Sequence, residues 1–136
     1  MKVLFAHRVY PGQFRNLINH LASDSRHQVK YLAYQLHDPP LPSIEVGQCE
    51  PFRRSHESVH PCISSTEQAI LFAQAAYRTA ARFKTQGFEP DIIFGHSGWG
   101  PTLVLRDLFP KANFLGYFEW FYRSRGSSHG FHPNIP

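Results

Sequence analysis

The 136-residue sequence lacks a long hydrophobic run, and it is poor in cysteine. No apolar stretch reaches the roughly 18 residues that cross a bilayer, and the start, MKVLFAHRVYPG, lacks the apolar core and small residues of a signal peptide. A cytoplasmic location is therefore expected, and a peripheral contact with the inner face of the membrane stays open. The spacing of Cys49 and Cys62 matches neither a zinc pair nor a redox motif, so disulfides are not expected.

The common phosphate-binding glycine motifs are also missing. G-x-G-x-x-G does not follow the first predicted strand, and G-x-x-x-x-G-K-[ST] occurs nowhere, which argues against a dinucleotide oxidoreductase and a P-loop phosphotransferase. Basic residues exceed acidic ones by only 14 − 10 = 4, a weak attraction to anions that does not require nucleic acid as a partner. With 42% hydrophobic and 18% charged residues, the chain has the composition of one packed globular domain.

Predicted strands and helices alternate along the chain. Apolar, strand-forming runs separated by helices indicate a parallel sheet that is covered on both faces, with right-handed crossovers. The expected fold is therefore α/β, a doubly wound Rossmann-like sheet of about five strands. Strands are predicted at 2–7, 28–34, more weakly within 44–54, at 91–95 and at 113–118, and a short helix is predicted at 102–109.

Two longer helices have clear sequence signals. After the Pro11-Gly12 turn, apolar residues at positions 14, 17, 18 and 21 have the spacing of an amphipathic helix. Ser64 and Glu67 form a capping-box pattern that predicts the start of a long helix ending near Gly87. The predicted apolar face of that helix comprises Ala69, Ile70, Ala73, Ala76, Tyr77, Ala80 and Phe83.

The loop after the first strand, HRVYPGQF, is a candidate binding loop. In a doubly wound sheet, the loops after the first and fourth strands meet at the carboxyl edge. Gly12 would let a ligand approach the backbone, and the free amides of the following helix would point toward a bound anion. Arg15 lies in the first turn of that helix.

The loop after the fourth strand, GHSGWG, carries side chains suited to chemistry. His96 offers a proton-carrying ring, Ser97 a hydroxyl and Trp99 a stacking surface. Together the two loops favour a cleft for a polar, phosphorylated ligand.

Two other motifs suggest different enzymes. HESVH at 56–60 matches the zinc-protease pattern H-E-x-x-H, but Pro61 follows directly and no helical pattern surrounds it, so a zinc site is not expected. GHSGW approaches the nucleophile elbow G-x-S-x-G with Ser97 as the nucleophile. Trp99 replaces the last glycine. Asp107 and His129 follow in the order of an acid and a base, but Asp107 falls in the predicted helix directly after the turn, so an esterase is a minor alternative.

Three segments together resemble the amino-terminal domain of bacterial family 4 glycosyltransferases. They are FAHRVYPGQFRNL at 5–17, PDIIFGHSGWGPTLVLRDLFP at 90–110 and LGYFEWFYR at 115–123, in the order expected for the branch that opens with a PGQF loop. The resemblance implies a GT-B fold, in which two Rossmann-like domains face each other across a cleft. It also implies that residues 1–125 form the acceptor-side domain, that 126–136 are a tail or the start of an interdomain segment, and that the carboxyl-terminal donor domain is absent from this chain.

The resemblance assigns roles to individual residues. Gly12 would lie near the donor diphosphate, His96 near the transferred sugar, and Glu119 at a cleft position where many relatives carry histidine. The candidate catalytic residues are His96 and Glu119, and the candidate substrate-binding residues are Gly12, Gln13, Arg15, Ser97, Gly98 and Trp99. No metal ion or other cofactor is expected, because side chains and helix ends would stabilise the leaving diphosphate.

The expected function is therefore half of a transferase that moves a sugar from a nucleotide-sugar to a saccharide or lipid-linked acceptor in polysaccharide assembly. The fragment alone is expected to be inactive. The alternative is a module that binds a nucleotide or phosphate without catalysis. The aromatic and basic stretch after Glu119 fits an interdomain segment more simply than a nucleic-acid surface.

Overall fold

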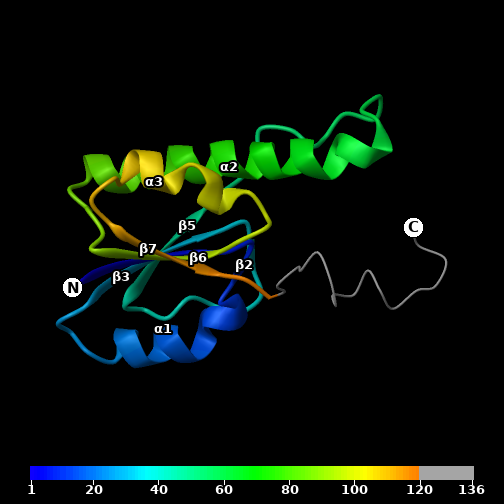
Figure 1. Cartoon of the computed structure of the whole chain (residues 1–136). Helices are drawn as coiled ribbons and strands as arrows, with labels where there is room; N and C mark the ends of the chain where they lie inside the picture. Colours follow the sequence, from blue (N-terminus) through cyan, green and yellow to red (C-terminus); the bar gives the residue numbers. More distant parts are fainter. Residues whose placement is uncertain (120–136) are drawn as a thin grey trace, which may run out of the picture.

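A five-stranded parallel sheet between two helical layers forms the body of the protein (Figure 1). The structure is a computed structural model, and it describes residues 1–119. The strands of the main sheet are β1 (Lys2–Ala6), β3 (Gln28–Ala33), β5 (Ile44–Gln48), β6 (Ile92–His96) and β7 (Asn113–Tyr117). The remaining elements are β2 (Val9–Tyr10), β4 (Gln35–Leu36), the 3-10 turns η1 (Gly12–Phe14) and η2 (Pro101–Leu103), and the helices α1 (Arg15–Ala22), α2 (Pro61–Thr85) and α3 (Leu105–Leu108).

The strand order places a topological switch between β1 and β6. The order is β5-β3-β1-β6-β7, and every neighbouring pair is parallel. The chain moves outward from β1 through β3 to β5, and α2 then returns it to the other side of β1, where Val3 pairs with Ile92. This confirms the predicted doubly wound sheet, and the weakly predicted third strand is β5. Ligands of such folds bind outside the carboxyl ends of the strands at the switch.

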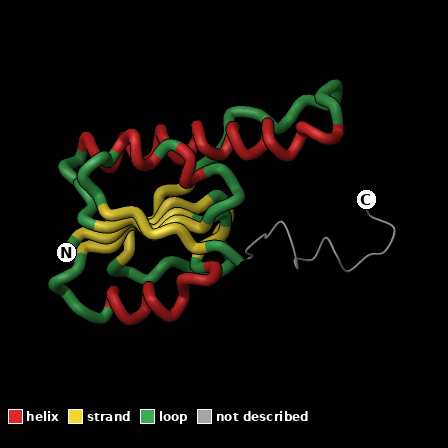
Figure 2. The backbone as a smooth tube through the Cα atoms, viewed as in Figure 1, coloured by secondary structure: helices red, strands yellow, loops and turns green. Residues whose placement is uncertain are grey.

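Helices cover both faces of the sheet (Figure 2), and each face has its own apolar core. Successive residues of a strand point to opposite faces. Val3 and Phe5 of β1 accordingly pack with Phe14 and with Ile18 of α1, and Leu4 packs on the other face with buried residues of α2 and α3. The described residues thus bury both faces of a continuous sheet, as the apolar strand sequences predict.

The beginning of α2 differs from the prediction. The helix starts at Pro61 with His60 as its N-cap, and the His60 ring accepts a hydrogen bond from the Cys62 amide at 3.2 Å. Proline suits the first helical position because its missing N–H would have no intrahelical partner there. Glu67, expected in a capping box with Ser64, instead accepts a hydrogen bond from Arg53 at 2.6 Å. The predicted capping box is therefore wrong.

The buried face of α2 agrees with the predicted one only in part. The buried residues Ala73, Ala76, Ala80 and Phe83 were predicted. Phe72 is buried as well, whereas Ile70 and Tyr77 are 46% and 44% exposed. The helix ends as predicted, with Gly87 at φ 82° just beyond it.

Three smaller observations complete the fold. The segment predicted as one helix at 102–109 is divided into η2 and the four-residue α3. The short strands β2 and β4 form a separate parallel pair beyond the ends of β1 and β3, which was not predicted. Among the described residues, no helix is both long and apolar enough to cross a membrane. The expected tail at 126–136 lies outside the described residues.

Candidate active site at the switch between β1 and β6

Two buried histidines lie side by side where β1 and β6 end. His7 follows β1 and is 7% exposed, and His96 ends β6 and is 2% exposed. Their ring centroids are 4.4 Å apart in an edge-to-face arrangement. Gly12 packs directly against the His7 ring. Its φ is 51°, and a Cβ at this position would come within 2.7 Å of Nδ1 of His7. The two loops singled out in the sequence are therefore neighbours, as expected.

The polar atoms of the two rings are incompletely paired. Nδ1 of His7 lies 2.8 Å from both the amide nitrogen and the carbonyl oxygen of Val9. Within the described part of the chain, Nε2 of His7 and Nδ1 of His96 have no hydrogen-bond partner, and the contact of Nε2 of His96 is with the Glu119 carboxylate at 3.3 Å. Burial lowers the pKa of His7 below 6.5. Buried polar atoms are usually hydrogen-bonded, so these free nitrogens are candidates for contact with a ligand.

Glu119 brings a carboxylate to this pair of rings. Its Oε1 lies 3.3 Å from Nε2 of His96 and accepts a hydrogen bond from the Gln13 side chain. The carboxylate is 51% exposed and, with His7, Arg8, Gln13, Gln35 and Trp99, lines a cavity of about 320 Å³. A carboxylate beside an imidazole can hold a protonated ring or accept a proton from a bound hydroxyl. His96, Glu119 and Gln13, all predicted as site residues, are thus brought together.

A comparison with known protein families shows to which family the chain belongs. The sequence matches the family model of the glycosyl transferase family 4 group over residues 25–136. The chain belongs to that family. No curated protein and no solved structure matches it. The β1 strand and the Gly12 loop precede the matched residues, so their place in the site comes from the structure alone.

The other predicted site residues of this family 4 domain are Arg15, Ser97, Gly98 and Trp99. Arg15 points to the surface, where its guanidinium pairs with Asp38 at 2.6 Å. The amide of Ser97 donates a hydrogen bond to the carbonyl of Tyr117 at 2.9 Å. Gly98 and Trp99 line a second cavity of about 440 Å³ beside α2.

The esterase alternative finds no support in the geometry of Ser97. A nucleophile elbow holds its serine in a strained turn. Within residues 1–119, positive φ angles occur only at glycines, so the φ of Ser97 is not in the left-handed region. Its acid candidate Asp107 lies on α3, and His129 lies outside the described residues.

The HESVH segment of the transferase domain forms local turn contacts instead of a metal site. Nδ1 of His56 lies 2.7 Å from the Ser58 hydroxyl, and His60 caps α2. The described residues contain no group of three or more side chains placed to hold a metal ion. The motif is not helical, in agreement with the expectation from Pro61.

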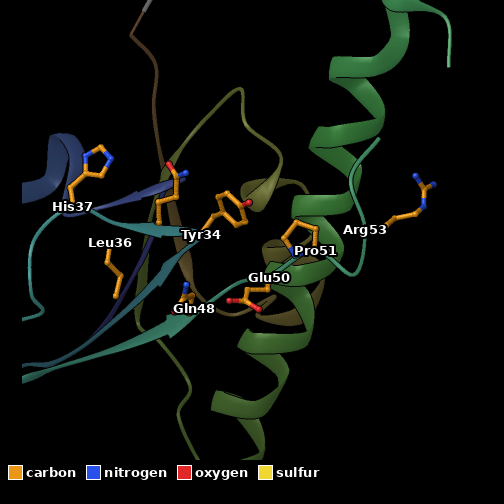
Figure 3. Close-up of a pocket in the computed structure, with 8 residues that line it drawn as sticks. Tyr34, Leu36, His37, Gln48, Glu50, Pro51 and Arg53 are labelled. Carbon is orange, nitrogen blue, oxygen red and sulfur yellow. The ribbon is translucent and has the colours of Figure 1, made fainter. Parts of the chain in front are cut away.

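Sequence reasoning missed three residues of the cleft. His7 and Arg8 belong to the predicted binding loop HRVYPGQF but have no individual role in that prediction, and Gln35 is not among the predicted site residues. A signal for all three exists in the topology, because each follows a parallel strand at its carboxyl end. Gln35 also borders a third cavity of about 590 Å³ beside the ends of β3 and β5, and its lining includes Tyr34, Gln48 and Glu50 (Figure 3). Shared lining residues therefore connect the three cavities along the carboxyl edge of the sheet.

Proposed function

We propose that this domain forms the acceptor side of a transferase that moves a glycosyl group from a nucleotide-sugar to a saccharide or lipid-linked acceptor. The observation that carries the proposal is the contact between His96 and Glu119 at the switch point, beside a cavity that opens to solvent. Membership of the glycosyl transferase family 4 group supports the reaction class.

In this proposal the acceptor hydroxyl lies in the cavity next to Glu119. Its oxygen forms the new bond to the anomeric carbon of the donor, and the bond from that carbon to the diphosphate oxygen breaks. The proton of the hydroxyl passes to the His96–Glu119 pair or to the leaving diphosphate. Proton transfer to a positioned side chain contributes a factor of about 100 to 10,000 to a rate.

The donor diphosphate would lie against the Gly12 loop in this proposal. Gly12 and Gln13 open η1, and α1 follows at once, so amides at this end of the helical segment could stabilise the developing negative charge. Gln13 also donates to Glu119, which would link the diphosphate side of the cleft to the acceptor side. No metal ion is needed for these steps.

The test is release of nucleoside diphosphate by the full-length protein, measured with a panel of uridine- and guanosine-diphosphate sugars and saccharide or lipid-linked acceptors. Glu119→Gln keeps the size of the side chain, and its amide oxygen can still accept the hydrogen bond from Gln13. Because the variant lacks the carboxylate, it should lower kcat by about 100-fold or more. His96→Ala should have a similar effect. The matched control is His20→Ala, because His20 is exposed on α1 and does not line the cavity that contains Glu119.

Three results would contradict the proposal. Donor binding without turnover in any combination would favour a module that binds without catalysis. An unchanged kcat in Glu119→Gln would remove the carboxylate from the reaction. A loss of activity in His20→Ala as large as in His96→Ala would show that the effect of the histidine variants is not local.

A further inference from the structure

Arg8 occupies an unusual position beside the proposed acceptor cavity. Its guanidinium carbon lies 5.4 Å from the centre of the Phe72 ring on α2 and 5.5 Å from the Trp99 ring. Its Nε is buried and has no hydrogen-bond partner within residues 1–119. The side chain forms no ion pair in this part of the protein, whereas Arg15 and Arg53 each pair with a carboxylate.

This arrangement leaves a positive charge held in place without a counter-charge. Contacts with two aromatic faces restrict the guanidinium and remove part of its hydration. Leaving a buried N–H donor unpaired costs free energy, which a ligand that accepts a hydrogen bond would recover. The planar guanidinium fits the oxygens of a phosphate or carboxylate.

The cavity on one side of Arg8 has a largely apolar lining. It measures about 440 Å³ and lies between the amino-terminal half of α2 and the loop after β6. Trp99 and Leu103 are 43% and 59% exposed there. The apolar side chains in its wall are Ala69, Phe72, Trp99 and Leu103, and the uncharged polar side chains are Ser65, Thr66, Gln68 and Thr102. Its size and lining suit an alkyl chain better than a sugar, which needs many hydrogen-bond partners.

The cavity on the other side of Arg8 is the one that contains Glu119. Arg8 and Trp99 line both cavities and therefore stand between them. A negatively charged group is attracted to Arg8 and repelled by the Glu119 carboxylate, whereas a hydroxyl is suited to Glu119. This charge pattern orients a ligand with its anion at Arg8, its alkyl part in the apolar cavity and its hydroxyl toward Glu119.

We propose that Arg8 binds the phosphate of an acceptor whose alkyl chain occupies the cavity formed by Phe72, Trp99 and Leu103. Among the acceptors allowed by the proposed function, on which this inference rests, it selects a lipid phosphate. The recognised unit is the alkyl phosphate itself, which can be tested without any transfer of sugar.

The experiment is calorimetric titration of the full-length protein with octyl phosphate below its micellar concentration. Inorganic phosphate and octyl glucoside serve as the two comparison ligands, because one lacks the chain and the other lacks the charge. Octyl phosphate should bind saturably and at least about tenfold more tightly than either. Equal binding of inorganic phosphate would reduce the site to a small-anion site and overturn the inference. Equal binding of octyl glucoside would do the same, because Arg8 would then select nothing.

Variants locate the binding. Arg8→Gln should weaken octyl phosphate about 10- to 100-fold, the range for the loss of a hydrogen bond to a charged group. Leu103→Asp should weaken it as well, by placing a carboxylate at the exposed rim of the apolar cavity. Arg106→Gln is the matched control, since Arg106 is exposed on α3 and lines neither cavity. Unchanged affinity in Arg8→Gln would overturn the inference.

Two further measurements keep the result interpretable. If Arg8→Gln does not fold, Arg8→Lys keeps the charge but loses the planar fork, and its affinity should fall between those of the wild type and Leu103→Asp. Sugar transfer to an acceptor without phosphate, together with no binding of octyl phosphate, would overturn this inference and leave the proposed function standing. Binding of octyl phosphate by a protein that transfers no sugar would do the reverse.

Discussion

Gly100 offers a sharp test of how the loop after β6 is held against α2. Its φ is 97°, a conformation that side-chain-bearing residues rarely adopt. A Cβ at this position would lie 2.0 Å from the carbonyl oxygen of Ala69 and 2.7 Å from its carbonyl carbon. These are backbone atoms of a helix, so no change of rotamer can relieve the contact. Gly100→Ala must therefore separate the loop from α2.

The expected loss of stability has two parts. The unfavourable backbone conformation costs about 1–3 kcal/mol, and overpacking against α2 adds about 1–3 kcal/mol. Gly98→Ala isolates the first part, because Gly98 has φ 107° but nothing lies within 4 Å of its Cβ position. Urea unfolding followed by far-UV circular dichroism measures both variants. Gly100→Ala should lose about 1–3 kcal/mol more than Gly98→Ala. Equal losses would show that the close approach to Ala69 does not exist in solution.

Two further expectations follow from buried titratable groups. Burial lowers the pKa of His7 in the folded protein below its ordinary value of 6.5. At a pH between the lowered pKa and 6.5, His7 therefore binds more protons in the unfolded chain than in the folded protein. The free energy of unfolding should therefore fall as the pH drops below about 6.5. His7→Gln should make the midpoint of urea unfolding depend less on pH between 7.5 and 5. An unchanged dependence of the midpoint on pH would contradict this. Burial also raises the pKa of the Cys49 thiol to about 11, whereas Cys62 is exposed. Iodoacetamide at pH 8 should label Cys62 quickly and Cys49 only on unfolding, as read by peptide mass spectrometry, and rapid labelling of Cys49 would contradict its burial.

The order of the elements was predictable because local patterns determine it. Five apolar segments with strand-forming residues became the five strands, and the Pro11-Gly12 turn was followed by the expected helix. The meeting of His96 with the Gly12 loop was also predictable, because the doubly wound topology brings these ends together.

The orientation of α2 depended on contacts that a helical pattern does not contain. Phe72 is buried because Tyr34 and Arg8, from loops distant in sequence, come to meet it, with the Tyr34 ring centroid 4.8 Å away. Glu67 was expected to cap the helix, but Arg53 lies close enough to compete for its carboxylate. In both cases tertiary contacts outweighed a local preference.

Arg8 could not be assigned from the sequence for the same reason. A single arginine after a strand has no distinguishing spacing, and its environment is built by Phe72 and Trp99 from two other parts of the chain. Only the position at the carboxyl end of β1, next to the switch, could have drawn attention to it.

The pairing of Val3 with Ile92 has a consequence for synthesis of the protein on the ribosome. At about 5–20 residues per second, translation reaches the partner of Val3 roughly 4–18 s after Val3 itself. During that interval β1 can already pair with β3, but its opposite edge has unsatisfied amides and carbonyls that another nascent chain could bind. Emergence of β6 closes that edge, so the strand that completes the candidate site also ends the period in which the nascent chain is most prone to aggregate.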